Sequence, residues 1–277
     1  MGTFAKRVVN RALGAVGYQI RKIQPSDSQA SRDQPSTDYQ LLSASTASHL
    51  GLIDLDPNFL PVMRSVKPYT MTSVERMFAL YKSVEYVVKA RIAGDILESG
   101  VWRGGSMMLV ASTLLSLGDT SRTLHLFDTY EGHPKPDREN DIDLYGNPVT
   151  DHASNRTSDE GSDWGYVSIE EVHANMASTG YPMDKVVLVK GKVEKTAQAH
   201  APVPLSLLRL DTDWYASAKV ALETFWPLLT RKGVLIIDDY GHYPSQRRVV
   251  DEYFARSPVM LHRVDYSCRT VIKTDDS

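Results

Sequence analysis

The sequence has a single cysteine among 277 residues, Cys268, so a disulfide within the chain and a zinc site built from several thiolates are both excluded. It has no run of about 18 apolar residues, the length needed to cross a bilayer as a helix. It also has little net charge, −3 from 31 basic and 34 acidic residues, which argues against general attraction to nucleic acid. We therefore expect a cytoplasmic protein of a reducing compartment, with no nucleic-acid partner.

The first 22 residues are basic and amphipathic. They carry five Lys or Arg and no acidic residue, and their apolar residues recur at roughly helical spacing. Charged residues interrupt the apolar positions, which disfavours a secretory signal. We expect a short helix over residues 1–22 that suits an anionic membrane surface, another subunit or its own domain. Residues 23–50, rich in Ser, Gln, Asp and Thr, are predicted to be a polar linker before the main domain at 51–277.

Short apolar runs then alternate with helical patterns. A helix is expected to begin at Thr72 or Ser73, either of which can cap it. Further helical periodicity covers residues 106–117, 168–179 and 216–229. Strand-like runs occupy residues 95–99, 123–128, 186–190, 205–210 and 233–237. This alternation predicts an α/β fold with a doubly wound parallel sheet, because parallel neighbours require crossover connections.

Two further segments complete the expected domain. The runs at 259–265 and 268–273 predict an antiparallel hairpin at the edge of the sheet. Residues 131–165 follow the second strand, contain nine acidic residues and have no periodicity. A loop of this length in a compact domain is usually functional or disordered, and this one leaves the carboxyl edge of the sheet, where ligands bind. We predict that it is a lid.

The first predicted strand runs directly into a glycine-rich turn, residues 98–106 (ESGVWRGGS). Gly100 permits the tight turn, and the glycines at its end let backbone approach a ligand at a helix N-terminus. Tryptophan stands at position 102, where a dinucleotide-binding turn needs its second glycine, so the turn disfavours a pyrophosphate. Asp128 ends the second strand, in the position of the acid that accepts hydrogen bonds from ribose hydroxyls.

Acidic residues also end the fourth and fifth predicted strands. Asp211 ends the fourth, and Asp238 and Asp239 end the fifth. Neighbouring strands lie about 5 Å apart, so these carboxylates should converge at one edge of the sheet and need a cation. An all-oxygen donor set favours Mg²⁺, Mn²⁺ or Ca²⁺. The alternative is structural, with Asp213 and Asp239 as simple caps of the following helix or turn.

Several segments together resemble the macrocin O-methyltransferase family, whose members use S-adenosylmethionine to methylate sugar hydroxyls of macrolide and aminocoumarin antibiotics. The resemblance spans roughly residues 59–273. It rests on residues 70–77 (TMTSVERM), 94–105 (GDILESGVWRGG), 128–132 (DTYEG), 208–213 (LRLDTD) and 238–240 (DDY).

The resemblance implies a class I methyltransferase fold with a seven-stranded sheet, S-adenosylmethionine as methyl donor and a divalent ion, Mg²⁺ or Mn²⁺. It implies that Asp211, Asp238 and Asp239 bind the metal, and we expect Asp211, or failing that Asp213, to act as general base. The implied cofactor contacts are Thr70, Met71, Glu98, Ser99, Gly100, Val101, Trp102, Asp128, Thr129, Tyr130, Glu131, Gly132, Ser168 and Gly191.

The predicted activity is a metal-dependent O-methylation of a sugar hydroxyl on a glycosylated natural product or glycan. A hydroxyl beside the methylated one would complete a chelate, so we expect an acceptor with a vicinal diol. Three other interpretations stay open: a methyltransferase acting on a catechol or other phenolic diol, a nicotinamide-dependent sugar oxidoreductase, and a non-catalytic carbohydrate- or metal-binding module. The sequence leaves the oligomeric state open, a homo-oligomer included.

Overall fold

The computed structural model describes residues 56–274, apart from 144, 157–160 and 203. These residues belong to one compact unit that spans residues 48–277. The helix expected at 1–22 and the linker expected at 23–50 lie outside the described residues and stay predictions. Among the helices that are described, none is long and apolar enough to cross a membrane.

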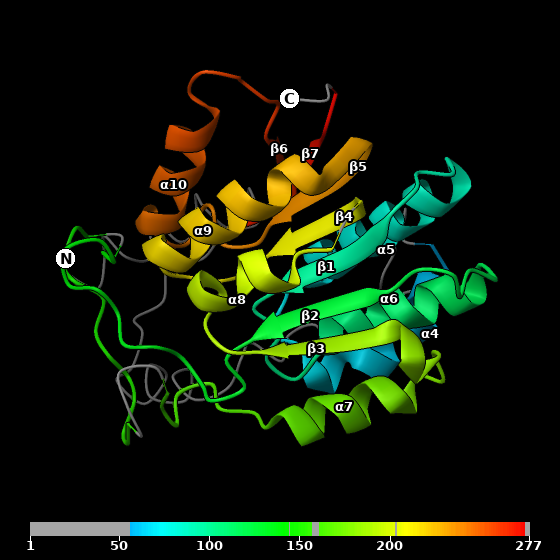
Figure 1. Ribbon diagram of the computed structural model, residues 1–277, viewed down its shortest axis with the longest axis horizontal. Helices are drawn as coiled ribbons and strands as arrows, with labels where there is room; N and C mark the ends of the chain where they lie inside the picture. The colour runs from blue at the N-terminus through cyan, green and yellow to red at the C-terminus, as the bar shows by residue number, and fades with distance from the viewer. Residues whose placement is uncertain (1–55, 144, 157–160, 203, 275–277) are drawn as a thin grey trace, which may run out of the picture. The chain divides into compact units, whose positions relative to one another are not determined.

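A seven-stranded sheet forms the centre of the unit, in the order β3-β2-β1-β4-β5-β7-β6 (Figure 1). The first five strands in this order are parallel, whereas β7 runs antiparallel to both β5 and β6. Both the parallel sheet and the C-terminal antiparallel hairpin predicted from the sequence are thereby confirmed. The strands are β1 (Asp95–Ser99), β2 (Leu124–Asp128), β3 (Val186–Lys190), β4 (Leu205–Leu210), β5 (Leu229–Ile237), β6 (His262–Arg263) and β7 (Arg269–Ile272).

Helices cover both faces of the sheet (Figure 1). One face carries α4 (Phe59–Val66), α5 (Val74–Lys89), α6 (Gly105–Ser116) and α7 (Ile169–Ser178). The other carries α8 (Val193–His200), α9 (Tyr215–Phe225) and α10 (Pro244–Phe254). Three short 3₁₀ turns lie at Lys67–Tyr69, Met183–Lys185 and Trp226–Leu228.

Successive side chains of each strand enter the two apolar layers in turn, because side chains in a strand alternate between its faces. On β1, Ile96 packs into the layer under α4–α7, and Leu97 packs into the layer under α8–α10. Both are completely buried. The sheet therefore has no solvated face at its centre, and the polar residues that end its strands collect at the carboxyl edge.

The helix that precedes the sheet begins as the sequence predicts. The hydroxyl oxygen of Ser73 accepts a hydrogen bond from the backbone N–H of Arg76 (3.2 Å), which satisfies one of the free donors of the first turn of α5. This cap aligns Arg76 with the carboxyl edge of the sheet, where its guanidinium group meets acids from other elements.

The turn after β1 packs directly on the segment after β4. Gly100 has φ +87°, a conformation that side chains rarely adopt, and a Cβ atom added there would lie 1.8 Å from the carbonyl oxygen of Asp211. The backbone N–H of Asp211 donates a hydrogen bond to the carbonyl of Ser99 (2.8 Å). The glycine therefore allows the turn after β1 and the acid after β4 to touch.

We expect Gly100→Ala to destabilise the protein by more than its backbone conformation alone explains. Gly118→Ala is a matched control, because Gly118 also has positive φ (+72°) but no atom within 4 Å of the added Cβ. The control should lower the free energy of unfolding by about 1–2 kcal/mol, the penalty for a left-handed conformation. Urea unfolding should show a clearly larger loss for Gly100→Ala, and equal losses would contradict the close packing described above.

Candidate functional site

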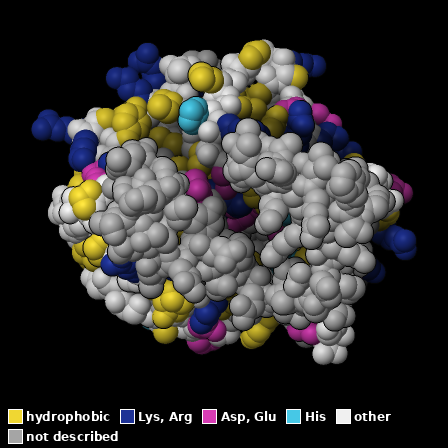
Figure 2. All heavy atoms as spheres, turned by 180° about the vertical axis from the view of Figure 1, so that it is seen from behind, with side chains coloured by type: hydrophobic (Ala, Val, Ile, Leu, Met, Phe, Trp, Pro, Cys, Tyr) yellow, Lys and Arg dark blue, Asp and Glu magenta, His cyan; other side chains and the backbone are white. Residues whose placement is uncertain are grey.

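A cavity of about 390 Å³ lies at the carboxyl edge of the sheet. Its walls come from the loops that follow β1 to β5, from residues 69–72 before α5, and from Tyr266 in the β6–β7 turn. Acidic side chains are also visible in a hollow near the middle of the face shown in Figure 2. The cavity therefore lies where open α/β sheets bind their ligands.

The turn after β1 forms one side of the cavity with its backbone. Residues 99–102 and Gly105 line it, and Trp102 has a positive φ of +47°, unusual for a non-glycine residue. The hydroxyl of Ser99 is buried and has no hydrogen-bond partner among the residues that the structure describes. A buried polar atom without a partner at a cavity wall is suited to a polar ligand, so this side fits the predicted methyl donor.

Asp128 holds this turn in place. Its Oδ2 accepts hydrogen bonds from the backbone N–H groups of Val101 (2.6 Å) and Trp102 (3.1 Å), and its Oδ1 accepts one from Tyr130 N–H (2.8 Å). The carboxylate also lines the cavity. Asp128 thus fixes the backbone of the turn, a role that the sequence analysis did not predict. The ribose contact predicted for it stays a prediction.

Ten of the predicted cofactor residues line the cavity. They are Thr70, Met71, Ser99, Gly100, Val101, Trp102, Asp128, Thr129, Gly132 and Gly191. Four others do not line the cavity, and their side chains contact other protein groups. Glu98 is fully buried against Arg209, Tyr130 donates its hydroxyl to Leu126 C=O (3.0 Å), Glu131 pairs with Lys190 (2.9 Å), and Ser168 caps α7.

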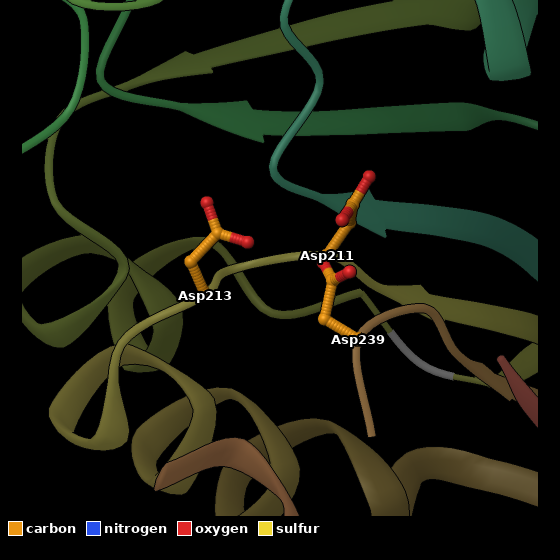
Figure 3. A group of neighbouring side chains, drawn as sticks. All are labelled: Asp211, Asp213 and Asp239. Atoms are coloured by element: carbon orange, nitrogen blue, oxygen red, sulfur yellow. The ribbon is translucent and has the colours of Figure 1, made fainter. Parts of the chain in front are cut away.

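Three carboxylates face one another on the other side of the cavity. One oxygen from each of Asp211, Asp213 and Asp239 lies within 4.8 Å of the others, and Figure 3 shows the three side chains around a common space. Asp213 reaches this position because its backbone adopts φ +50°. We call these three residues the acidic cluster.

Burial and mutual repulsion disfavour the charged forms of the cluster. Burial, followed by the charge of Asp211, raises the pKa of Asp213 to about 7. Burial also raises the pKa values of Asp211 and Asp239 well above the ordinary aspartate range. A bound divalent cation would relieve this repulsion, and the all-oxygen donor set fits Mg²⁺ or Mn²⁺.

Asp238, one of the predicted metal ligands, lies outside the acidic cluster and pairs with two arginines. Its Oδ2 lies 2.6 Å from Arg76 Nη1 and its Oδ1 lies 2.7 Å from Arg209 Nη2. Both Asp238 and Asp239 line the cavity, but only the Asp239 carboxylate belongs to the acidic cluster. In the described residues Asp213, which we expected only as a second choice for the base, completes the group instead.

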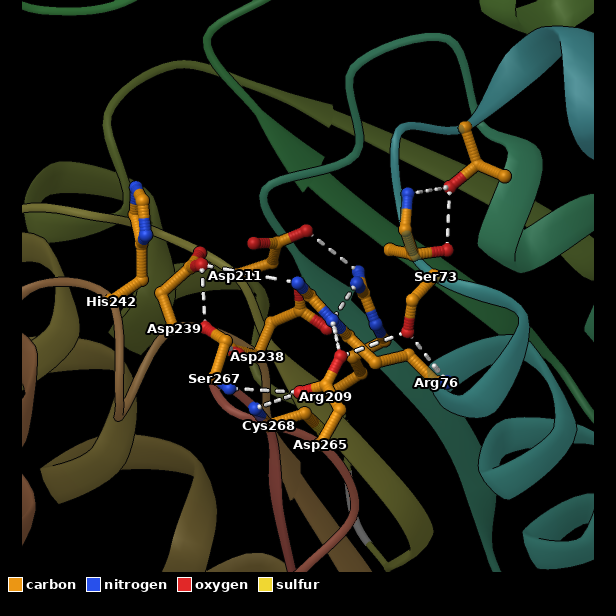
Figure 4. Close-up of polar contacts among 12 residues, drawn as sticks. Ser73, Arg76, Arg209, Asp211, Asp238, Asp239, His242, Asp265, Ser267 and Cys268 are labelled. Carbon is orange, nitrogen blue, oxygen red and sulfur yellow. Dashed lines mark hydrogen bonds and ion pairs between the residues drawn. The ribbon is translucent and has the colours of Figure 1, made fainter. Parts of the chain in front are cut away.

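Two arginines that the sequence analysis did not single out organise these acids (Figure 4). Buried Arg209 contacts Glu98, Asp211 (2.9 Å) and Asp238, while Arg76 bridges Asp238 and Asp265 (2.8 Å). The sequence does contain a signal for the role of Arg209. The apolar strand LSLLRL contains one arginine, and a buried arginine requires acidic partners.

The segment predicted to be a lid emerges at the carboxyl edge of the sheet (Figure 1). Its residues Gly132, His133, Pro134 and Trp164 line the cavity wall. Nδ1 of His133 lies 3.4 Å from Asp213 Oδ2, and burial lowers the pKa of this imidazole. Farther along the segment, Asp141 Oδ1 accepts a hydrogen bond from the N–H of Tyr215 at the start of α9 (2.8 Å). Opening of the lid stays a prediction.

Comparison with known proteins connects this geometry to a family. The model for macrocin O-methyltransferases matches residues 63–271, about three quarters of the sequence. The chain belongs to the macrocin O-methyltransferase family. It is therefore an S-adenosylmethionine-dependent O-methyltransferase, and the nicotinamide-dependent oxidoreductase and the non-catalytic module are set aside.

Two curated proteins and one solved structure are similar to this chain. A tetracenomycin 4'-O-methyltransferase of Streptomyces olivaceus, whose named acceptor carries a dimethoxy-rhamnosyl group, is 32% identical over 73% of this chain and 74% of its own length. Mycinamicin III 3''-O-methyltransferase of Micromonospora griseorubida is 31% identical over 67% of this chain and 70% of its own. The O-methyltransferase NovP superimposes with a TM-score of 0.64 at 26% identity, over 75% of this chain and 83% of its own.

We expect the two adjacent aspartates after β5 to respond oppositely to loss of charge. Asp238→Asn weakens two buried arginine contacts and should lower the free energy of unfolding by about 3 kcal/mol. Burial and the neighbouring acids already disfavour the charged form of Asp239, so Asp239→Asn should leave stability unchanged or raised. Thermal and urea unfolding in the presence of a chelator measure both. Equal destabilisation by the two variants would contradict the separation of their roles.

Proposed function

We propose that this enzyme transfers the methyl group of S-adenosylmethionine to a sugar hydroxyl of a glycosylated natural product, with a divalent cation at the acidic cluster. The contact between the turn after β1 and Asp211 carries this proposal. Asp211 N–H binds the Ser99 carbonyl at 2.8 Å, so the base is built onto the wall that faces the methyl donor. The names of the two relatives above, both acting on glycosylated antibiotics, support a sugar acceptor.

The chain's own residues would position the reaction. Methyl transfer from a sulfonium is an in-line displacement, so the acceptor oxygen must lie behind the methyl group. The glycine-rich turn would hold the donor, and Asp211, beside that turn, would remove the hydroxyl proton as the new bond forms. Asp213 is the second choice for the base, because it lies farther along the loop, next to His133 of the lid.

The acidic cluster would supply the metal ligands. Asp211, Asp213 and Asp239 provide the oxygens that Mg²⁺ or Mn²⁺ prefers, and Arg209 does not neutralise Asp213 or Asp239 by any contact in the described structure. A divalent cation held there stabilises the negative charge that develops on the acceptor oxygen. Two adjacent hydroxyls would share such a cation, which supports an acceptor with a vicinal diol.

The first experiment measures methyl transfer from S-adenosylmethionine to methyl glycosides of L-rhamnose, D-glucose and D-mannose, and to catechol for the phenolic alternative. We expect transfer to at least one glycoside, dependent on added Mg²⁺ or Mn²⁺ and abolished by chelator. Transfer to catechol alone would contradict the sugar acceptor. Full activity in chelator would contradict the metal.

The second experiment separates chemistry from donor binding. Asp211→Asn and Asp239→Asn should lower kcat by at least about 100-fold, the usual contribution of a general base or a metal ligand. Calorimetry should show S-adenosylmethionine affinity within about threefold of wild type, because both carboxylates face the acceptor side. Equal loss of donor affinity and turnover would place these residues in the donor site instead.

A further inference from the structure

A half-exposed tyrosine stands at the mouth of the cavity. Tyr266, in the β6–β7 turn, is 55% exposed and is one of the cavity-lining residues. Large aromatic side chains left exposed at a cavity mouth are common in binding sites, because their rings offer apolar area at a small cost in conformational entropy. Tyr266 has no part in the methyl transfer proposed above.

Hydrogen bonds to Asp265 fix the backbone of the turn that carries Tyr266. Asp265 Oδ1 accepts hydrogen bonds from the backbone N–H groups of Ser267 and Cys268, both at 2.8 Å. Its Oδ2 accepts two more, from the hydroxyl of Ser73 and from Nε of Arg76, also at 2.8 Å. Figure 4 shows this carboxylate at the centre of the contacts between the turn and α5. The backbone beneath the tyrosine is therefore preorganised.

The loop after β5 supports the same turn from the other side. A Cβ atom added to Gly241 would lie 1.9 Å from the carbonyl oxygen of Tyr266, so the two backbones are in contact. The hydroxyl of Tyr266 lies 3.2 Å from Nδ1 of His242. The guanidinium group of Arg76 lies 5.8 Å from the centre of the tyrosine ring, within cation–π range. The ring is thus held by neighbours while much of it stays open to solvent.

Aromatic rings connect this mouth to the interior of the cavity. Ring centres lie 5.9 Å apart for Tyr266 and His242, 4.7 Å for His242 and Tyr243, and 5.8 Å for Tyr243 and Trp214. The backbone N–H groups of His242 and Tyr243 both donate to the carbonyl of Asp239, 3.0 Å away. The row of rings therefore starts beside the acidic cluster and ends at Tyr266.

The size of the cavity indicates which part of an acceptor would contact Tyr266. At about 390 Å³ it lies near the lower limit of ligand pockets, about 300–1,000 Å³, and it must hold the methyl donor and the reacting sugar together. The group attached to that sugar therefore extends out of the cavity. We infer that Tyr266, supported by His242, forms an outer subsite that stacks on the ring attached to the methylated sugar and selects glycosides that carry one.

This inference rests on the proposed sugar methylation, and its test uses matched acceptors. For the sugar that gives most turnover among those named above, kcat/KM is measured for the methyl glycoside and the p-nitrophenyl glycoside. We expect Tyr266→Ala to lower the aryl-to-methyl ratio of kcat/KM about three- to tenfold, the range for loss of one aromatic contact. Tyr266→Phe keeps the ring and should stay within about twofold of the wild-type ratio.

Two controls separate stacking from general effects. Tyr166→Ala removes a tyrosine that is equally exposed (57%) but does not line the cavity, and it should leave the ratio unchanged. Tyr266→Leu keeps apolar bulk without an aromatic ring, so it should lower the ratio as Tyr266→Ala does. It tests the stacking even if Tyr266→Ala folds poorly.

The outcomes distinguish failure of the proposed sugar methylation from failure of the outer subsite. No methyl transfer by the wild-type enzyme to any glycoside would overturn the proposed function and this inference with it. Transfer with an aryl-to-methyl ratio that is unchanged in Tyr266→Leu would overturn the outer subsite alone. A change in Tyr166→Ala as large as that in Tyr266→Leu would also overturn it, since the effect would then not belong to the cavity mouth.

Discussion

The site depends on buried Arg209, whose guanidinium group contacts acids from the ends of three adjacent strands. It meets Glu98 of β1, Asp211 after β4 and Asp238 after β5. Without a cation these carboxylates could not share one edge of the sheet in their charged forms, because each would be desolvated beside the others. Arg209 offsets the charge of Glu98 and Asp238 and also contacts Asp211, whereas Asp213 and Asp239 have no contact with it among the described residues. Asp211 thereby links the arginine to the acidic cluster.

The sequence predicted the fold well because its elements have strong patterns. Each of the five parallel strands is a short apolar run with polar or glycine boundaries, and the capping serine of α5 is local to its helix. The helices α4, α8 and α10 were not predicted, and α4, like α8, has only eight residues. α8 has eight residues and buries only Val193 and Ala197, so its apolar pattern is too short to recognise. α10 begins with Pro244 and is mostly polar, and only contact with the second apolar layer reveals its buried side.

The site was predicted less completely, because its details depend on side-chain direction. Convergence of acids at the strand ends follows from topology alone: all four predicted aspartates line the cavity, and three of them form the acidic cluster. Asp238 is kept out of the cluster by its contacts with Arg76 and Arg209, and Asp213 joins it through a left-handed backbone conformation. Neither feature follows from a local sequence pattern. Likewise, Glu98 lies in a motif typical of cofactor binding, yet an arginine 111 residues later in the chain occupies it.

The contact between Arg76 and Asp265 joins residues 189 positions apart in the sequence, across the antiparallel hairpin at the sheet edge. Contacts of such long range close large loops and tend to form late when a chain folds. The parallel sheet can thus be complete while the acidic edge is still unfinished. Detachment of the hairpin alone would break this contact and the hydrogen bonds beneath Tyr266, while most of the hydrophobic core could stay folded.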